Sequence, residues 1–104
     1  MKLTIIIPVY NEKKTIVKVL DLIEKQVEIK KQIIVVNDCS TDNSFELLNQ
    51  YNFSSDYLLL SHSQNLGKGA CIKKAKKYAE GEIIIIQDAD LEYNPNDYQP
   101  LLSS

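Results

Sequence analysis

Four short apolar runs constrain the fold of this chain more than any other feature. They are rich in Ile, Val and Leu, and they are continuous instead of alternating with polar residues, which is typical of strands buried on both faces of a parallel sheet. The runs are Leu3–Val9, Ile33–Val36, Tyr57–Leu60 and Ile83–Ile86. Each is far shorter than the roughly 20 residues that cross a bilayer. The runs therefore predict the strands of a globular protein.

Segments of helical character separate these runs. One of them has an apolar face made by Ile16, Val19, Leu20, Ile23 and Val27. Ser40 and Asp42 are expected to cap a second helix, and a third is expected to begin at 67–69 and to stop at Gly81. Strands that alternate with helices in this way build parallel sheets. We predict an α/β fold with a three-layer, Rossmann-like, mostly parallel sheet and one domain over residues 1–104.

Composition excludes several classes of function. The chain has 12 Lys+Arg and 14 Asp+Glu, a net charge of −2, whereas nonspecific nucleic-acid binding needs a basic surface. Nucleic acid is therefore not an expected partner. Cys39 and Cys71 lack the spacing of a metal site, and the N-terminus lacks a signal-peptide pattern, so we expect two reduced thiols in a cytoplasmic protein. His62 follows no nucleophile motif and is expected on the surface or in a loop.

Acidic residues follow the last apolar run, where open α/β sheets bind ligands. Asp88, Asp90 and Glu92 alternate with other residues, so an extended backbone would point their carboxylates in one direction. Such carboxylates repel one another unless a cation relieves them, and their oxygens suit Mg²⁺ or Mn²⁺ that also binds substrate phosphates. The alternative is a set of turn or cap carboxylates ahead of Pro95.

Two other segments carry candidate ligand groups, each with a structural alternative. Asp38 follows the second run, where a carboxylate can accept hydrogen bonds from a base or a ribose, whereas Asp42 is better placed to cap a helix. Lys68 lies between two glycines at a helix start, a position that favours phosphate, although the segment is not a Walker A motif and suits a flexible turn equally. The lysines at 73–77 predict a solvated helix face.

Four motifs in series carry a resemblance to a known family. They are Ile6–Glu12, Val35–Asp42, Asn65–Gly69 and Gln87–Glu92. In this order and spacing they resemble the amino-terminal half of a family 2 glycosyltransferase, over nearly the whole chain. The last motif is most similar to the branch that includes dolichyl-phosphate mannose synthase and other polyprenyl-phosphate glycosyltransferases.

The resemblance implies a GT-A fold with strand order 3-2-1-4 for the four strands present. It implies transfer of a sugar, with inversion, from a UDP- or GDP-sugar to an acceptor such as a polyprenyl phosphate at the inner face of a membrane. The donor nucleotide would be bound by Pro8, Tyr10, Glu12, Asp38, Lys68 and Asp88. A Mg²⁺ or Mn²⁺ ion would be held by Asp88, Asp90 and Glu92. In the family, any catalytic base comes from a downstream half, so none is assigned within residues 1–104.

The length of the chain departs from the family pattern, because family members have a longer catalytic domain. The resemblance therefore implies a truncated domain, or self-association through the apolar edge of the Ile83–Ile86 strand. Two other classes stay open at this point. One is a noncatalytic nucleotide-binding or assembly module that lacks the acceptor half. The other is a flavodoxin-like or receiver-type domain, which also gathers carboxylates after its strands but uses a fifth strand.

Overall fold

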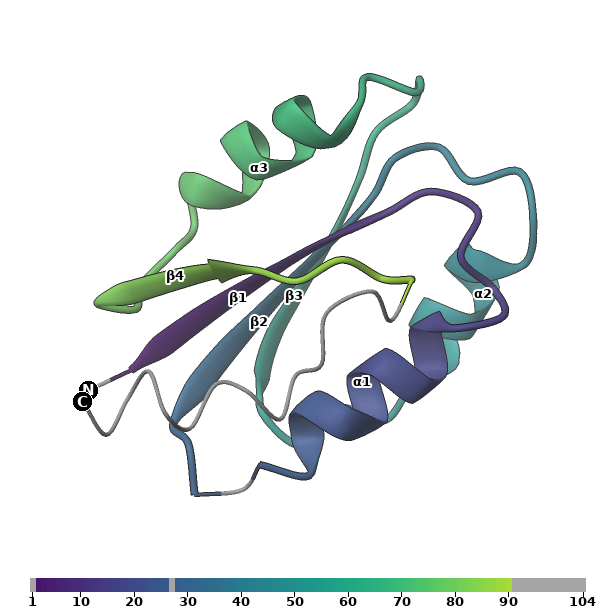
Figure 1. The fold of residues 1–104 in the computed structure, drawn as a ribbon. Helices are drawn as coiled ribbons and strands as arrows, with labels where there is room; N and C mark the ends of the chain where they lie inside the picture. The colour runs from purple at the N-terminus through teal and green to yellow at the C-terminus, as the bar shows by residue number, and fades with distance from the viewer. Residues whose placement is uncertain (1, 27, 91–104) are drawn as a thin grey trace.

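The computed structural model describes residues 2–26 and 28–90, which form a four-stranded sheet with helices on both sides (Figure 1). In chain order the elements are β1 (Leu3–Val9), α1 (Ile16–Glu24), β2 (Lys31–Asn37), α2 (Ser44–Gln50), β3 (Asp56–Ser61), α3 (Lys68–Lys76) and β4 (Ile83–Ile86). The strands are parallel, in the order β3-β2-β1-β4. The predicted α/β fold and strand order are confirmed, while Val27, expected in the first helix, lies outside the described residues.

β1 and β2 form the centre of the sheet. Ile5 of β1 pairs with Ile33 of β2 on one side and with Ile85 of β4 on the other. Every residue of β2 is buried. Their continuous apolar composition follows from this position, because helices cover both faces of the central strands. Since the strands are parallel, their carboxyl ends meet at one edge of the molecule.

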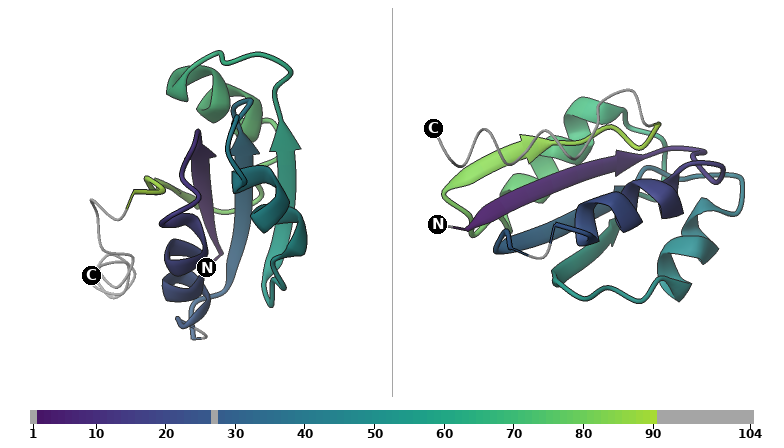
Figure 2. Two further views of the ribbon diagram at one scale, coloured as in Figure 1. Left: turned by 90° about the vertical axis from the view of Figure 1, so that its right-hand side faces the viewer. Right: turned by 60° about the horizontal axis from the view of Figure 1, so that its bottom comes forward.

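Helices lie on both faces of the sheet (Figure 2), and an apolar core forms on each face. On one face Ile5 belongs to a core with Leu20 of α1 and Leu48 of α2. On the other face Ile6 belongs to a smaller core with Cys71 of α3. Successive residues of β1 thus point to opposite layers, as the period of a strand requires. The three predicted layers are α1 with α2, the sheet, and α3.

The third helix is shorter than predicted, and Gly81 has a different role. α3 ends at Lys76, so Gly81 does not stop it. A Cβ atom at Gly81 would lie 2.5 Å from Oγ1 of Thr4 and 2.6 Å from its backbone N. The N–H of Gly81 donates to Thr4 Oγ1 at 2.8 Å, and that hydroxyl donates to Gln32 Oε1 at 2.9 Å. Gly81 is therefore required for close approach to the sheet.

The caps predicted for the second helix are only partly correct. The N-cap position is Asn43, whose side chain makes no capping hydrogen bond. The carboxylate of Asp42 accepts a hydrogen bond at 2.8 Å from the N–H of Ser44, the first helical residue, so Asp42 satisfies the helix start from one position earlier. Ser40 is not a cap, because its Oγ accepts a hydrogen bond from the N–H of Asn11 at 3.1 Å.

Candidate functional site

A cavity of about 260 Å³ opens at the carboxyl ends of β1, β2 and β4. The sheet order reverses between β1 and β4, which is where open α/β sheets bind ligands. The cavity is lined by Pro8, Val9, Tyr10, Glu12, Asp38, Lys68, Cys71, Asp88, Ala89 and Asp90. Every predicted site residue that the structure describes is therefore in one place. Glu92, the remaining predicted metal ligand, lies outside the described residues.

The segment after β1 is fixed by Asn11. Its φ of 54° lies in the left-handed region, which Asn adopts more readily than most residues. In this conformation its Oδ1 accepts hydrogen bonds from the N–H groups of Thr41 at 2.7 Å and Asp42 at 3.2 Å. The next N–H, of Glu12, donates to Oγ of the buried Ser44 at 2.9 Å. These bonds hold Glu12 against the segment that follows β2.

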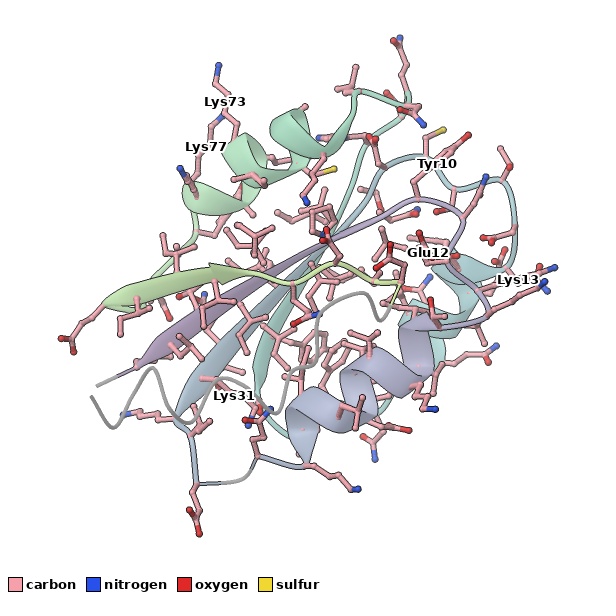
Figure 3. All side chains as sticks on the ribbon, in the orientation of Figure 1. Tyr10, Glu12, Lys13, Lys31, Lys73 and Lys77 are labelled. Atoms are coloured by element: carbon pink, nitrogen blue, oxygen red, sulfur yellow. The ribbon has the colours of Figure 1, made fainter. Side chains whose placement is uncertain are left out.

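Besides Asp38, three carboxylates line the same cavity. Glu12 follows β1, whereas Asp88 and Asp90 follow β4. Burial raises the pKa of Glu12 above its ordinary value, and the negative charges of Asp90 and Asp88 raise it further. Figure 3 shows Tyr10 and Glu12 along the same segment beyond the end of β1. The cavity therefore has a negatively charged wall that favours a bound cation.

Asp90 reaches the cavity by a route that differs from the predicted one. β4 ends at Ile86, and the chain turns at residues 89 and 90 instead of continuing as an extended strand. The hydroxyl of Thr15, just before α1, donates a hydrogen bond to the carbonyl oxygen of Ala89. This bond holds the turn against the start of α1, so Asp88 and Asp90 face the cavity from a turn and not from a strand.

Lys68 faces Asp88 across the cavity. Its Nζ donates to Asp88 Oδ1 at 2.7 Å. Gly67 precedes it with a φ of 95°, a conformation that strains residues with a side chain. The turn at Gly67 thus places the first residue of α3 at the site. Lys73 and Lys77 project outward from the same helix, which agrees with the predicted solvated face (Figure 3).

Asp38 anchors the segment between β3 and α3. Its side chain is 5% exposed, and its two oxygens accept hydrogen bonds from the N–H groups of Leu66 at 2.9 Å and Gly67 at 2.8 Å. Nδ1 of His62 lies 2.7 Å from Oδ1. Burial alone would raise the pKa of Asp38, but these hydrogen bonds together hold it below its ordinary value. The ionised carboxylate can only accept, so Nδ1 of His62 is the donor.

His62 lies in the loop directly after β3, which agrees with the prediction of a surface or loop histidine, but its side chain is not exposed. Its side chain is 7% exposed and bonds to Asp38. Sγ of Cys71 lies 4.0 Å from the same ring nitrogen. Burial, and then the charge of Asp38, raise the pKa of the Cys71 thiol to about 11, so it is a poor nucleophile at neutral pH. Both Cys39 and Cys71 are free thiols, as predicted.

Two groups of side chains have the chemistry of metal ligands. Within the described ranges, only Asp38, His62 and Cys71 place three potential ligand atoms within 4.8 Å of one another. That group is already joined by hydrogen bonds, and three of them occupy most acceptor positions of the buried carboxylate. Asp88 and Asp90 instead offer hard oxygen donors in an open cavity. They fit Mg²⁺ or Mn²⁺, which takes one or two protein carboxylates and completes its shell with water and phosphate.

Sequence reasoning missed the residues that support the site. Asn11 had a readable signal, because Asn is one of the few residues that favour the left-handed region. Ser44 and His62 had none, because each acts on a residue that is brought near only by the pairing of parallel strands. His62, for example, is 24 positions from Asp38 in the sequence.

The strand order and the acidic crevice define a class of protein, the α/β domains of the GT-A type. Within that class, the profile of Glycosyl transferase family 2 matches residues 4–104. The chain therefore belongs to glycosyl transferase family 2, and the resemblance predicted from its four motifs is confirmed.

Individual relatives agree with this assignment. The chain is 38% identical over 96 residues to dolichyl-phosphate beta-glucosyltransferase ALG5C of Trichomonas vaginalis, which covers 84% of this chain and 28% of the relative. It matches the crystal structure of S. aureus TarS 1–349 in complex with UDP-GlcNAc with a TM-score of 0.85 and 29% identity, over 99% of this chain and 30% of that one. For mannosyltransferase PcManGT from Pyrobaculum calidifontis, in complex with GDP-Man and Mn²⁺, the TM-score is 0.79 at 30% identity. That match covers 85% of this chain and 27% of the mannosyltransferase. The chain thus spans less than a third of each relative.

Proposed function

We propose that this chain is the donor-binding part of a glycosyltransferase that transfers a sugar, with inversion, from a nucleoside diphosphate sugar to an acceptor. One observation carries the proposal: the residues that the four motifs predict for the donor line a single cavity at the reversal of the sheet. Membership of the family supports it, as does similarity to structures that contain UDP-GlcNAc and GDP-Man.

The two ends of the cavity suit the two ends of the nucleotide. Asp38 is buried at the carboxyl end of β2 and is proposed to receive the base, while Pro8 and Tyr10 line the adjoining wall. The diphosphate is proposed to lie toward Lys68, whose ammonium group suits phosphate oxygens. Glu12 lies on the wall with the acidic residues and is proposed to contact the donor from there.

Asp88 and Asp90 are proposed to hold Mg²⁺ or Mn²⁺, with Glu92 as a further ligand. When bound, such an ion offsets the negative charge that builds on the leaving diphosphate. The carboxylates act electrostatically in this scheme and not as nucleophiles. The protein would position the two Asp residues for this role. The Thr15 hydroxyl, which bonds to the carbonyl of Ala89 between them, holds their segment in place, and Lys68 contacts Asp88.

The acceptor is proposed to be a polyprenyl phosphate, used at the cytoplasmic face of a membrane. The similarity to a dolichyl-phosphate beta-glucosyltransferase supports this class of acceptor. In residues 2–26 and 28–90, no helix combines the length and the apolar character needed to cross a bilayer. Transfer of a radiolabelled sugar to a polyprenyl phosphate presented in vesicles tests the acceptor.

Isothermal titration calorimetry with UDP and GDP, with and without Mn²⁺, tests donor binding. We expect binding only with the metal. Asp90→Asn should weaken metal-dependent binding by at least about tenfold, since even the loss of an outer-shell partner costs about 10–100-fold. Asp56→Asn is the matched control, because Asp56 is an exposed carboxylate at the opposite end of the strands.

The outcomes separate the candidate functions. Metal-dependent nucleotide binding together with sugar transfer supports the transferase. The same binding without transfer or donor hydrolysis supports the noncatalytic nucleotide-binding or assembly module. If neither nucleotide binds in the presence of Mn²⁺, the proposed donor site is wrong.

A further inference from the structure

The hydrogen bonds of Asp38 limit what its carboxylate can still accept. Within the described part of the chain, Oδ1 accepts from Nδ1 of His62 at 2.7 Å and from the N–H of Leu66 at 2.9 Å. Oδ2 accepts from the N–H of Gly67 at 2.8 Å. An ionised carboxylate has about four acceptor positions, two on each oxygen. Oδ1 is therefore filled, and Oδ2 keeps one position.

This remaining position is the one that a ligand in the cavity can use without displacing a donor. Asp38 is among the lining residues, although only 5% of its side chain is exposed. The network that occupies the other positions is rigid, because two of its three donors are backbone N–H groups in the turn into α3. A ligand in the cavity therefore meets one acceptor on Oδ2 and cannot use both oxygens without displacing a buried donor.

The four nucleobases differ in what they present to one carboxylate acceptor. Uracil offers a single imide N–H between two carbonyl oxygens. Guanine offers a ring N–H with an amino N–H beside it, and the pair requires two acceptors. Cytosine and adenine present an unprotonated ring nitrogen at the equivalent place, and a carboxylate repels its lone pair. A buried polar group left without a partner lowers affinity.

We propose that Asp38, with one oxygen filled by His62 and Leu66, makes this a site for uridine diphosphate sugars in preference to guanosine diphosphate sugars. The inference rests on the proposed function, because it needs a donor nucleotide in the cavity. It names His62 as a specificity-determining residue that acts through Asp38 and does not itself contact the base.

Calorimetric titration of the chain with UDP, GDP and CDP, each in the presence of Mn²⁺, tests the proposal. We expect UDP to bind at least about tenfold more tightly than GDP, which corresponds to one unpaired buried donor, and more tightly than CDP. GDP binding as tight as UDP binding overturns the inference and leaves the proposed function standing. No binding of any of the three overturns the proposed function and the inference with it.

Variants of His62 test its role through Asp38. His62→Leu removes the donor to Oδ1 and opens a second acceptor, so GDP should gain affinity relative to UDP by several-fold. His62→Gln retains an N–H donor and should keep a ratio near that of the parent chain. Gln64→Ala, an exposed change in the same segment, is the control and should leave the ratio unchanged.

An unchanged ratio in a folded His62→Leu protein, checked by circular dichroism, contradicts the role of His62. If both His62 variants unfold, the comparison of UDP with GDP on the unaltered chain still decides the preference for uridine.

Discussion

The chemistry of single residues in this protein depends on what covers them. Cys71 is fully buried on the side of α3 that packs against the sheet, whereas Cys39 follows β2 and is partly exposed. Loss of water disfavours the charged thiolate, which is why the pKa of Cys71 rises to about 11. At neutral pH the thiol of Cys71 therefore stays protonated and packs as a small apolar group.

We expect the two thiols to react at very different rates. Iodoacetamide at about pH 8 should alkylate Cys39 in the native protein and leave Cys71 unmodified, because only an accessible thiolate attacks. In urea both should react. Mass spectrometry of the alkylated peptides measures the difference, and equal labelling of the two residues in the native protein would contradict it.

The positions of site residues could be predicted where residue type and local sequence carry the signal, while their roles stay predictions. Asp88 and Asp90 were predicted as a pair because two carboxylates directly follow a buried strand, and both line the cavity. The buried contact of His62 with Asp38 was not predicted, because a lone histidine has no local signal. Its environment is set by Asp38, which lies at the end of the neighbouring strand.

At the scale of elements, α3 connects the site to the sheet. It begins with Lys68 at Asp88, and its buried side chains Cys71 and Ala75 pack on the sheet. Lys68 is about half exposed, so solvent can take over its contact with Asp88 when another cation arrives there. Exposed ion pairs of this kind are weak. A divalent ion should therefore displace Lys68, which can then face the diphosphate.

Lys68→Met is expected to have opposite effects on the two ligands. Without nucleotide, Mn²⁺ should bind up to about fivefold more tightly, because an exposed ion pair that competes for Asp88 is worth at most about 1 kcal/mol. With Mn²⁺ present, UDP should bind more weakly. Electron paramagnetic resonance of free Mn²⁺ and calorimetry measure the two effects. Lys73→Met serves as the control, and weaker Mn²⁺ binding by Lys68→Met would refute the competition.

Gly81 gives a stability prediction for the connection between α3 and β4. Gly81→Ala should destabilise the protein by about 1–3 kcal/mol, because the added methyl group meets backbone and hydroxyl atoms of β1 that cannot move freely. Urea unfolding followed by circular dichroism measures the change. Gly69→Ala is the matched control, since a Cβ there has no atom within 4 Å. Equal stabilities for the two variants would contradict the packing role.

Strands were easier to predict than helix ends. The observed bounds of β1 and β4 match the apolar runs, because burial on both faces leaves a continuous signal. The end of α3 has no such signal in the local sequence, because contacts with a residue far away in the chain determine where the helix ends. The side chain of the buried Gln32 donates to the carbonyl of Tyr78 and accepts from the N–H of Glu80, both at 2.9 Å. Gln32 of β2 thus supplies hydrogen-bond partners to backbone groups of Tyr78 and Glu80 that a longer α3 would pair within the helix.

For the whole molecule, the edges of the sheet matter most. β4 pairs with β1 on one side, and among the described strands none pairs with its other side. Ile84 in this strand is 41% exposed. An exposed apolar edge strand is a template for pairing with another chain.

We therefore expect self-association that grows with protein concentration. Ile84→Lys should shift the population toward monomer, because a charge at a strand edge disfavours pairing. Size-exclusion chromatography with light scattering measures the mass. Val17→Lys, which alters a comparably exposed apolar residue on α1, should have no such effect. A monomer at every concentration in the unaltered chain would rule out association through this edge.

The strand order also sets when the site can form during synthesis. Of the four described strands β1 leaves the ribosome before the others, and β2 can pair with it and β3 with β2 as they follow, since neighbouring segments fold as they emerge. The other partner of β1 is β4, which pairs Ile83 with Leu3 and is the last of the four described strands to be translated. A nascent chain that has released β3 already presents Asp38 and Tyr10 but lacks the carboxylates after β4. The proposed cation ligands Asp88 and Asp90 are thus added in one step, after β1, β2 and β3 have been translated.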